Sequence, residues 1–311
     1  MSLRARLRRA LLRGGPLPVC VLFIVLLSLL AIGVSVLPVA DPTAQSAIFR
    51  LKPPSAEHLF GTDRLGRDIL SRVLWGARVS LLVGVGVVAL SAALGTLLGV
   101  LGGYFRGWPS TLVMRLTDIF LAFPPLILAM VMVTVLGNTL FTVVLAISAG
   151  LIPRFIRITR GTILSIRERD YVDAARALGA SHGRIILGYV LLNAMDPLIV
   201  LCTLLIPQAI LTEALLSFLG LGITDPTPTW GNMINSGQIV LREGPWLTLF
   251  PGAAIVLTVL AFNLVGDAIR DALDPAVRET GLPRAEAVDA RVARRARASE
   301  APAERPLTAV S

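Results

Sequence analysis

The side chains that most often carry chemistry are few in this sequence, and their positions exclude several kinds of active site. Lys52 is the only lysine of the 311 residues, and it stands in a proline-rich stretch rather than after the glycines of a phosphate-binding loop. Cys20 and Cys202 each fall in an apolar run without CxxC spacing, and His58 and His182 lie far apart in the chain. We therefore expect no catalytic residue, no metal site, no cofactor and no ATP hydrolysis by this chain itself.

The composition is that of a membrane protein. Hydrophobic residues make up 55% of the chain and charged residues only 16%, with a mean hydropathy of +0.76. Soluble domains carry roughly a quarter of their residues as charged side chains. Apolar stretches of about 20 residues are long enough to cross a bilayer as helices, which satisfy their backbone hydrogen bonds internally. The expected fold is an all-α polytopic membrane protein.

Six apolar runs are long enough to be transmembrane helices. They cover residues 19–39, 79–103, 119–136, 140–156, 198–216 and 246–265. The first follows several arginines, but it is longer than the apolar part of a signal peptide and no cleavage motif follows, so we interpret it as a retained anchor. Most of the 29 basic residues lie on one side of the membrane when both termini are cytoplasmic. The sequence thus predicts six transmembrane helices, N-in and C-in.

These spans divide the chain into four parts. Residues 1–45 hold the cytoplasmic N-terminus and the first span, and residues 46–78 form an extracytoplasmic connecting segment. Residues 79–275 form a core of five spans with a long cytoplasmic loop at 157–195. Residues 276–311 form a cytoplasmic tail rich in Ala, Arg, Glu and Pro, for which we expect disorder or a weak helix, with arginines that touch anionic lipid or nothing in particular.

One segment of the cytoplasmic loop has helical character. Tyr171 to Leu178 favour a helix, and Gly179 stands where a short helix would end. Ala174 and Ala175 are small enough to let the surface of another protein approach closely. An ordinary alanine-rich surface helix is the simpler interpretation of the same residues.

Together with Asp173, this segment resembles the EAAxxxG loop in the membrane subunits of ABC importers. In that family the loop forms a coupling helix that docks in a groove of the ATPase subunit. The resemblance therefore implies that Asp173, Ala174, Ala175 and Gly179 form an ATPase-coupling loop. The family usually continues to Ile-Leu-Pro, whereas this chain has Leu192 at the place of the proline, which puts the bend after the coupling helix in question.

Further stretches resemble the C-type permease subunits of dipeptide, oligopeptide and nickel importers. Residues 61–72 look like the GTDxxGRDxxSR signature, and residues 213–222, 230–233 and 266–275 are similar to later stretches of that subfamily. The resemblance implies a type I permease fold and half of the translocation pore of an ATP-driven importer for peptides or a related small solute. It also implies a bacterial or archaeal plasma membrane, a second permease subunit in a heterodimer, two ATP-binding subunits and an extracytoplasmic solute-binding protein. Membrane lipid is the remaining expected partner, and no nucleic acid is expected.

The outer signature has two interpretations. Asp63, Arg67 and Asp68 are candidates for contact with the binding protein. Alternatively, the acidic residues cap helices, while Arg67 and Arg72 stay solvated at the membrane interface.

Three residues within the spans are candidates for a pore or gate. Glu213 is an intramembrane acid, which by default faces a cavity or pairs with a neighbour; it would otherwise hold the outer end of its helix against the external loop. Pro124 and Pro125 are expected to kink the third span, for gating or for packing alone.

Other functions remain open for a polytopic membrane protein. An ion-coupled secondary transporter would place acidic or histidine residues near mid-bilayer, often in repeated halves, and the sequence places none clearly there. An intramembrane hydrolase would require an HExxH helix or paired mid-membrane aspartates, and the sequence shows neither. A non-transporting scaffold would bind an ATPase without stimulated transport.

Overall fold

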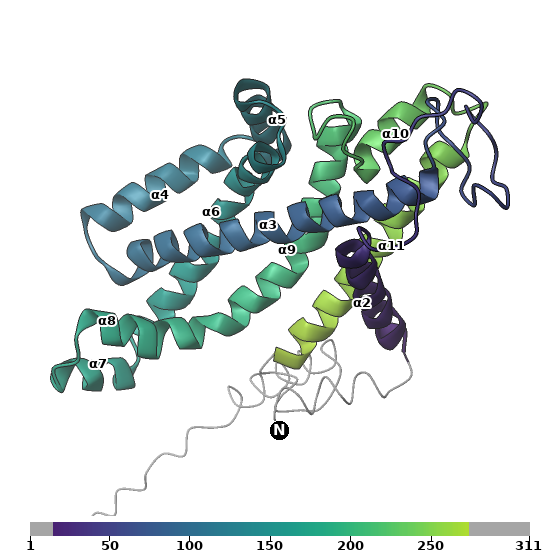
Figure 1. Cartoon of the computed structure of the whole chain (residues 1–311). Coiled ribbons are helices and arrows are strands. Elements are labelled where there is room, and N and C mark those ends of the chain that lie inside the picture. Colours follow the sequence, from purple (N-terminus) through teal and green to yellow (C-terminus); the bar gives the residue numbers. More distant parts are fainter. Residues whose placement is uncertain (1–14, 274–311) are drawn as a thin grey trace, which may run out of the picture.

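The computed structural model describes residues 15–273, and apart from one isolated bridge between Thr62 and Asp68 this part contains no β-structure. In chain order its helices are α2 (Leu17–Gly33), α3 (Ile69–Tyr104), α4 (Trp108–Leu121), α5 (Pro125–Leu136), α6 (Leu140–Arg167), α7 (Asp170–Ala177), α8 (His182–Ile185), a π-helical segment (Ile186–Leu191), α9 (Leu192–Phe218), α10 (Trp230–Gln238) and α11 (Trp246–Leu273) (Figure 1). The all-α expectation is confirmed for this part of the chain. The tail expected to be disordered, 276–311, lies outside the described residues.

Four helices of the described part are long and apolar enough to cross a membrane. They are α3, α6, the continuous helix His182–Phe218 and α11. A fifth crossing results if α4 and α5 are counted together. The 17 residues of α2 extend over about 25 Å, somewhat less than the roughly 30 Å of hydrocarbon in a bilayer. The structure thus gives four or five spans by length and composition, and the predicted sixth would have to be α2.

The prediction that residues 119–136 form one continuous helix is wrong. α4 ends at Leu121 and α5 begins at Pro125, and the two helices are bent by 89° at the break between them. Consecutive prolines remove two backbone donors and push the preceding residue out of the α conformation. The expected kink at Pro124 and Pro125 is therefore a full interruption.

Two other helices extend beyond the predicted apolar runs. α3 begins at Ile69 rather than at residue 79, because the Asp68 carboxylate caps it by accepting a hydrogen bond of 2.8 Å from the Ser71 amide. α6 continues to Arg167 and so includes the first residues of the predicted loop 157–195. Most of the rest of that loop is helical as well, in α7, α8 and the π-helical segment.

α3 packs closely against α6 along a row of glycines. Gly95, Gly99 and Gly103 recur at every fourth position of α3 and face α6. A Cβ atom added at Gly99 would lie 2.5 Å from Cβ of Thr159 and 3.0 Å from the carbonyl oxygen of Ile156. Small residues at this spacing let two helices approach closely within a membrane, where van der Waals packing largely drives their association. The glycines therefore fix how α3 and α6 lie against each other.

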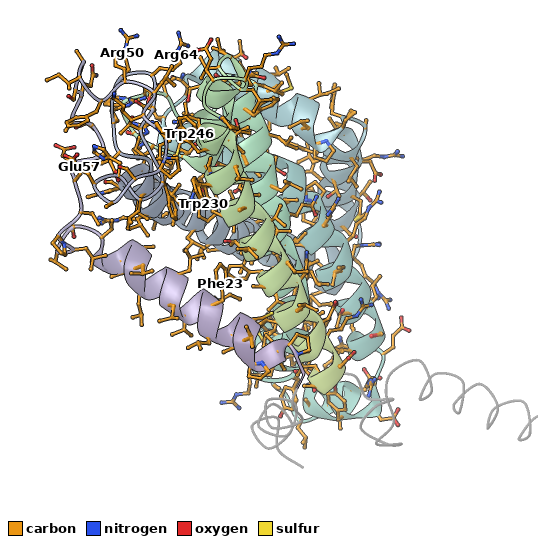
Figure 2. The ribbon with its side chains drawn as sticks, turned by 90° about the vertical axis from the view of Figure 1, so that its right-hand side faces the viewer. Phe23, Arg50, Glu57, Arg64, Trp230 and Trp246 are labelled. Carbon is orange, nitrogen blue, oxygen red and sulfur yellow. The ribbon has the colours of Figure 1, made fainter. Side chains whose placement is uncertain are left out.

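The segment between α2 and α3 folds over the end of the helices where α3 begins (Figure 2). Two tryptophans hold this end together: Trp230 joins α10 to α3, and Trp246 joins α11 to the segment. The Trp230 indole is fully buried and donates to the carbonyl of Val73 at 3.0 Å, and the Trp246 indole donates to the carbonyl of Thr62 at 3.1 Å. We call this end of the molecule the α10 end, and the opposite end, where α3 and α6 finish, the α7 end.

The glycine contact predicts the effect of a single methyl group. Gly99→Ala is expected to destabilise the purified protein by about 1–3 kcal/mol, because the new Cβ overlaps Thr159. Gly161→Ala is the matched control on α6: no heavy atom lies within 4 Å of its added Cβ, so it is expected to be neutral or stabilising by up to about 1 kcal/mol. The thermal midpoint in detergent, followed by size-exclusion chromatography, measures both. Equal midpoints would contradict the close packing.

Candidate functional site

The predicted end of the short helix in the loop is confirmed. Gly179 has φ +80°, a left-handed conformation that glycine adopts without strain. Its amide bonds to the carbonyl of Arg176 at 2.9 Å, and the amide of Ala180 bonds to the carbonyl of Ala175 at 3.0 Å. This pair of hydrogen bonds is the Schellman motif, which ends α7 and turns the chain toward α8.

α7 has one face buried in the molecule and another exposed. Val172 is fully buried and belongs to the same apolar cluster as Ile163 of α6. Ala175 is only 7% exposed, so its side chain helps to seat the helix. Ala174 is exposed, and Leu178 leaves 88% of its surface free. Of the two alanines, Ala174 is therefore the one that another protein can reach directly.

Asp173 lies on the exposed side of α7. Its carboxylate accepts a hydrogen bond from Arg176 at 2.9 Å, in an ion pair that is largely open to solvent. Such surface pairs contribute at most about 1 kcal/mol. Asp173 also lies in the first turn, where a negative charge is favourable. The residue therefore adds little to stability and stays available to a partner.

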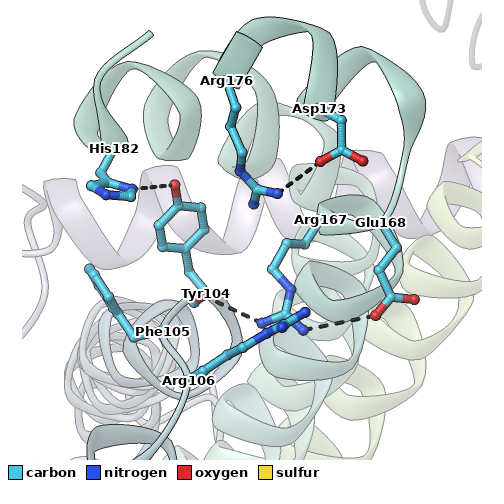
Figure 3. A pocket seen from close by; sticks show the side chains of 8 residues that line it. All are labelled: Tyr104, Phe105, Arg106, Arg167, Glu168, Asp173, Arg176 and His182. Carbon is cyan, nitrogen blue, oxygen red and sulfur yellow. Dashed lines mark hydrogen bonds and ion pairs between the residues drawn. The ribbon is translucent and has the colours of Figure 1, made fainter. Parts of the chain in front are cut away.

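A polar cavity of about 490 Å³ lies beside α7 at the ends of α3 and α6. Its lining residues are Tyr104, Phe105, Arg106, Arg167, Glu168, Asp173, Arg176 and His182 (Figure 3). The Tyr104 hydroxyl lies 2.8 Å from Nδ1 of His182, and Arg167 donates to the carbonyl of Gly103 at 3.1 Å. These contacts tie the end of α3 to α6 and α8. Sequence reasoning missed them, since nothing in the sequence relates Tyr104 to His182.

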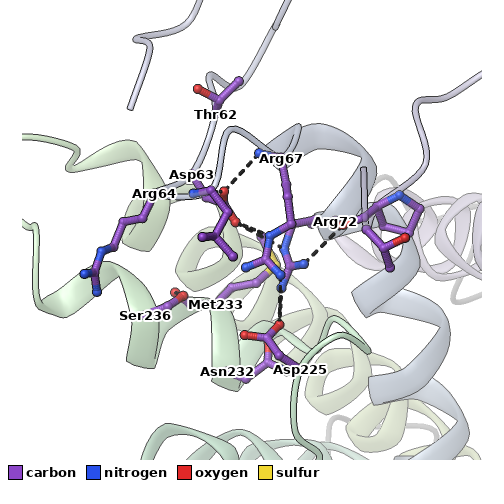
Figure 4. A network of polar contacts seen from close by, with 12 residues as sticks. Thr62, Asp63, Arg64, Arg67, Arg72, Asp225, Asn232, Met233 and Ser236 are labelled. Carbon is purple, nitrogen blue, oxygen red and sulfur yellow. Dashed lines mark hydrogen bonds and ion pairs between the residues drawn. The ribbon is translucent and has the colours of Figure 1, made fainter. Parts of the chain in front are cut away.

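At the α10 end, two buried arginines lie between two aspartates (Figure 4). Arg67 and Arg72 are 4% and 2% exposed. Nε of Arg67 lies 2.6 Å from Oδ2 of Asp63, and terminal nitrogens of Arg67 and Arg72 lie 3.2 and 3.0 Å from Oδ1 of Asp225. Buried charges require such partners, because desolvation of an unpaired ion is costly. The network joins the segment before α3, the first turn of α3 and the connection between α9 and α10.

This geometry confirms one part of the structural interpretation of residues 61–72 and contradicts another. Asp68 caps a helix, as the structural interpretation expected. The expectation that Arg67 and Arg72 stay solvated is wrong, because both are buried in ion pairs. Contact of Asp63, Arg67 and Asp68 with a binding protein stays a prediction. Asp225, with 54% of its side chain exposed, is the network member that reaches the surface, and its Asp-Pro dipeptide was the only sequence signal for it.

Glu213 is fully buried between helices. Its carboxylate accepts hydrogen bonds from Ser80 of α3 at 3.2 Å and from Ser217, one turn further along α9, at 2.8 Å. These bonds satisfy a polar group that would be costly to leave unpaired. The contact links α9 to α3, while a role in the pore stays a prediction.

Pro125 packs against α6. A Cβ added at Gly150 would lie 2.9 Å from Cβ of Pro125, so the start of α5 rests directly on the α6 backbone. This contact gives the break at Pro124 and Pro125 a packing role. The gating role stays a prediction.

Comparison with known proteins gives consistent matches over most of the chain. Residues 95–279 match the family described as binding-protein-dependent transport system inner membrane component. The chain is 45% identical over 229 residues to the dipeptide transport system permease protein of Alkalihalophilus pseudofirmus, covering 74% of this chain and 75% of the relative. It is 46% identical over 244 residues to the di/tripeptide transport system permease protein of Pseudomonas aeruginosa, covering 76% and 80%. It is also 44% identical over 225 residues to the glutathione transport system permease protein of Escherichia coli O6:K15:H31, covering 72% and 74%.

The buried network predicts unequal effects of two neighbouring substitutions. Arg67→Gln is expected to destabilise the protein by roughly 3 kcal/mol, because Asp63 would keep only Arg72 as a cation, at 3.9 Å. Arg64→Gln is the matched control: that side chain is exposed and points away from the network in Figure 4, so a change within about 0.5 kcal/mol is expected. Thermal midpoints in detergent compare the two. Similar midpoints would show that the network does not hold the segment between α2 and α3 in place.

Proposed function

Since this chain belongs to the family of binding-protein-dependent transport system inner membrane components, we propose that it forms half of a translocation pore for peptides or a related small solute. The chain is a multi-pass permease subunit of an ABC importer in the bacterial inner membrane. Such a system also contains ATPase and binding-protein components. The dipeptides, tripeptides and glutathione in the names of its relatives support a peptidic ligand.

The proposed assembly pairs this chain with a second permease, two ATP-binding subunits and a solute-binding protein outside the membrane. Large apolar side chains on α4 and α5 support the presence of a covering partner or lipid, as Ile119, Val131 and Val135 expose 58%, 56% and 77% of their surface. ATP hydrolysis belongs to the ATP-binding subunits in this assembly. This permease receives the energy through protein contact.

The proposed topology has six crossings with both termini in the cytoplasm. α2 is the first crossing, and the bent pair α4 and α5 is the third. This arrangement puts the α7 end in the cytoplasm, within reach of an ATPase, and the α10 end outside, within reach of a binding protein. The many arginines at the α7 end, among them Arg106, Arg167 and Arg176, support this orientation.

We further propose α7 as the helix through which the ATPase moves the pore, and the division of its faces carries this proposal. Ala174 and Leu178 are exposed for docking, while Val172 is packed in the cluster that includes Ile163 of α6. Closure of the ATPase pair on ATP displaces α7, and the buried face of α7 passes the displacement to α6 and α8. Tilting of these helices opens the pore to the outside, and release of ADP and phosphate reverses the change.

The topology can be tested by labelling introduced cysteines. Ser55→Cys and Thr227→Cys are expected to react with a membrane-impermeant thiol reagent added outside intact cells, and Ser181→Cys is expected to react only after permeabilisation. All three positions are exposed, so a lack of reaction reports sidedness rather than burial. Replacing Cys20 and Cys202 by alanine removes the background. The opposite pattern would invert the orientation and exclude α7 as the ATPase contact.

The coupling role can be tested by adding a bulky charge on α7. Ala174→Arg is expected to reduce uptake about tenfold or more and to weaken retention of the ATPase subunits during affinity purification, because a docked interface has no room for the side chain. Ala56→Arg, the same change at an exposed alanine of the segment before α3, is expected to retain the ATPase subunits. Equal retention together with normal uptake in Ala174→Arg would leave α7 as an ordinary surface helix.

A further inference from the structure

An arginine lies inside the apolar part of α6, on a face that this chain leaves open. Arg154 is exposed, although its neighbour Phe155 is fully buried against α3. Phe155 packs beside Gly95, and α3 continues for nine residues from there to its last residue, Tyr104, or about 13 Å. Arg154 therefore lies in the interior of α6, well before the ends of both helices, in the part of α6 that we take as membrane-spanning.

The charge of Arg154 is not neutralised within the described chain. Its one recorded polar contact is a hydrogen bond of 2.6 Å to Oε1 of Gln208 on α9, and no carboxylate among residues 15–273 lies within ion-pair distance of it. Arg157, the next arginine on this face, differs because it is paired with Asp118 of α4 at 3.0 Å. An unpaired intramembrane arginine is costly in lipid and faces a water-filled cavity or an anionic group.

Both side chains of this pair keep free hydrogen-bond donors. Gln208 uses its carbonyl oxygen to accept from Arg154, which leaves its NH₂ group to donate. Arg154 keeps further N–H groups of its planar guanidinium. A positively charged pair with several free donors fits an anion with two oxygens, above all a carboxylate.

We propose that Arg154 and Gln208 form a carboxylate-binding site on the translocation path, which holds the C-terminal carboxylate of a peptide in transit. The inference rests on the proposed function, because it takes the open face of α6, between α4 and α9, as the wall of the pore. One guanidinium shared with Gln208 gives modest affinity, as transport requires: the ligand must be able to bind and then leave.

The site can be tested by comparing how fast a nearby introduced thiol reacts with an anionic and with a cationic reagent. Ile158 is 37% exposed and lies one turn from Arg154 on the same face of α6. In an otherwise cysteine-free importer complex in proteoliposomes, turning over with ATP and binding protein, Ile158→Cys is expected to react with both the anionic sulfonatoethyl and the cationic trimethylammonium-ethyl methanethiosulfonate. The ratio of anionic to cationic rates is expected to fall about tenfold with Arg154→Gln. Arg242→Gln, at an exposed arginine between α10 and α11, is the matched control and is expected to leave the ratio unchanged.

Uptake of labelled alanyl-alanine by the same proteoliposomes separates the possible failures. Arg154→Gln is expected to lower uptake about tenfold and Arg154→Lys to restore part of it, with both permeases and the ATPase subunits still associated. Loss of the second permease from Arg154→Gln would show that Arg154 pairs across the interface, and an unchanged rate ratio would show that it does not attract anions; either result overturns the site. Missing ATP-dependent uptake in the complex with Arg154 intact would instead contradict a dipeptide as the ligand in the proposed function.

Discussion

The close contact between α3 and α6 is the constraint on which most of the structure depends. Gly95 and Gly99 let the two helices touch along their backbones, so the helices finish side by side at the α7 end. Arg167 can therefore bond to the last turn of α3, and Tyr104 can reach His182. α7 is seated against helices whose relative position is already fixed by backbone contact.

Polar groups set the orientation of these helices at the other end. Burial of apolar surface does little to fix how helices orient against each other in lipid. A hydrogen bond or ion pair does fix it, because it forms only at a defined distance and angle. The pair of Arg67 and Arg72 with Asp63 and Asp225 is of this kind. A buried ion network is weak evidence for stability in itself, but here it joins three segments that are far apart in the sequence. The segment between α2 and α3 is thus attached to the start of the same helix whose end supports α7.

The sequence predicted features that depend on neighbouring residues and missed those that depend on residues far apart in the chain. The helix end at Gly179 and the cap at Asp68 follow from residue type and a few neighbours, and both were predicted. The burial of Arg67 was not, because its partner Asp225 stands 158 residues further along the chain. Arg154 stands near the end of the predicted span 140–156, so the sequence alone placed it at the edge of an apolar run. Only the packing of the longer α6 against α3 shows that it lies deeper.

The π-helical segment, residues 186–191, gives the continuous helix His182–Phe218 a compliant joint. Each π turn closes its hydrogen bond over one more residue than an α turn and packs less well, so it deforms more easily than the helix on either side. Leu192 follows it, where the importer family usually has a proline, and the joint keeps the backbone donor that a proline would remove. A mechanical load on α8 can then be absorbed before it reaches α9, whose Glu213 stays on Ser80. α6 contains no π-helical turn, although Pro153 removes one of its backbone donors.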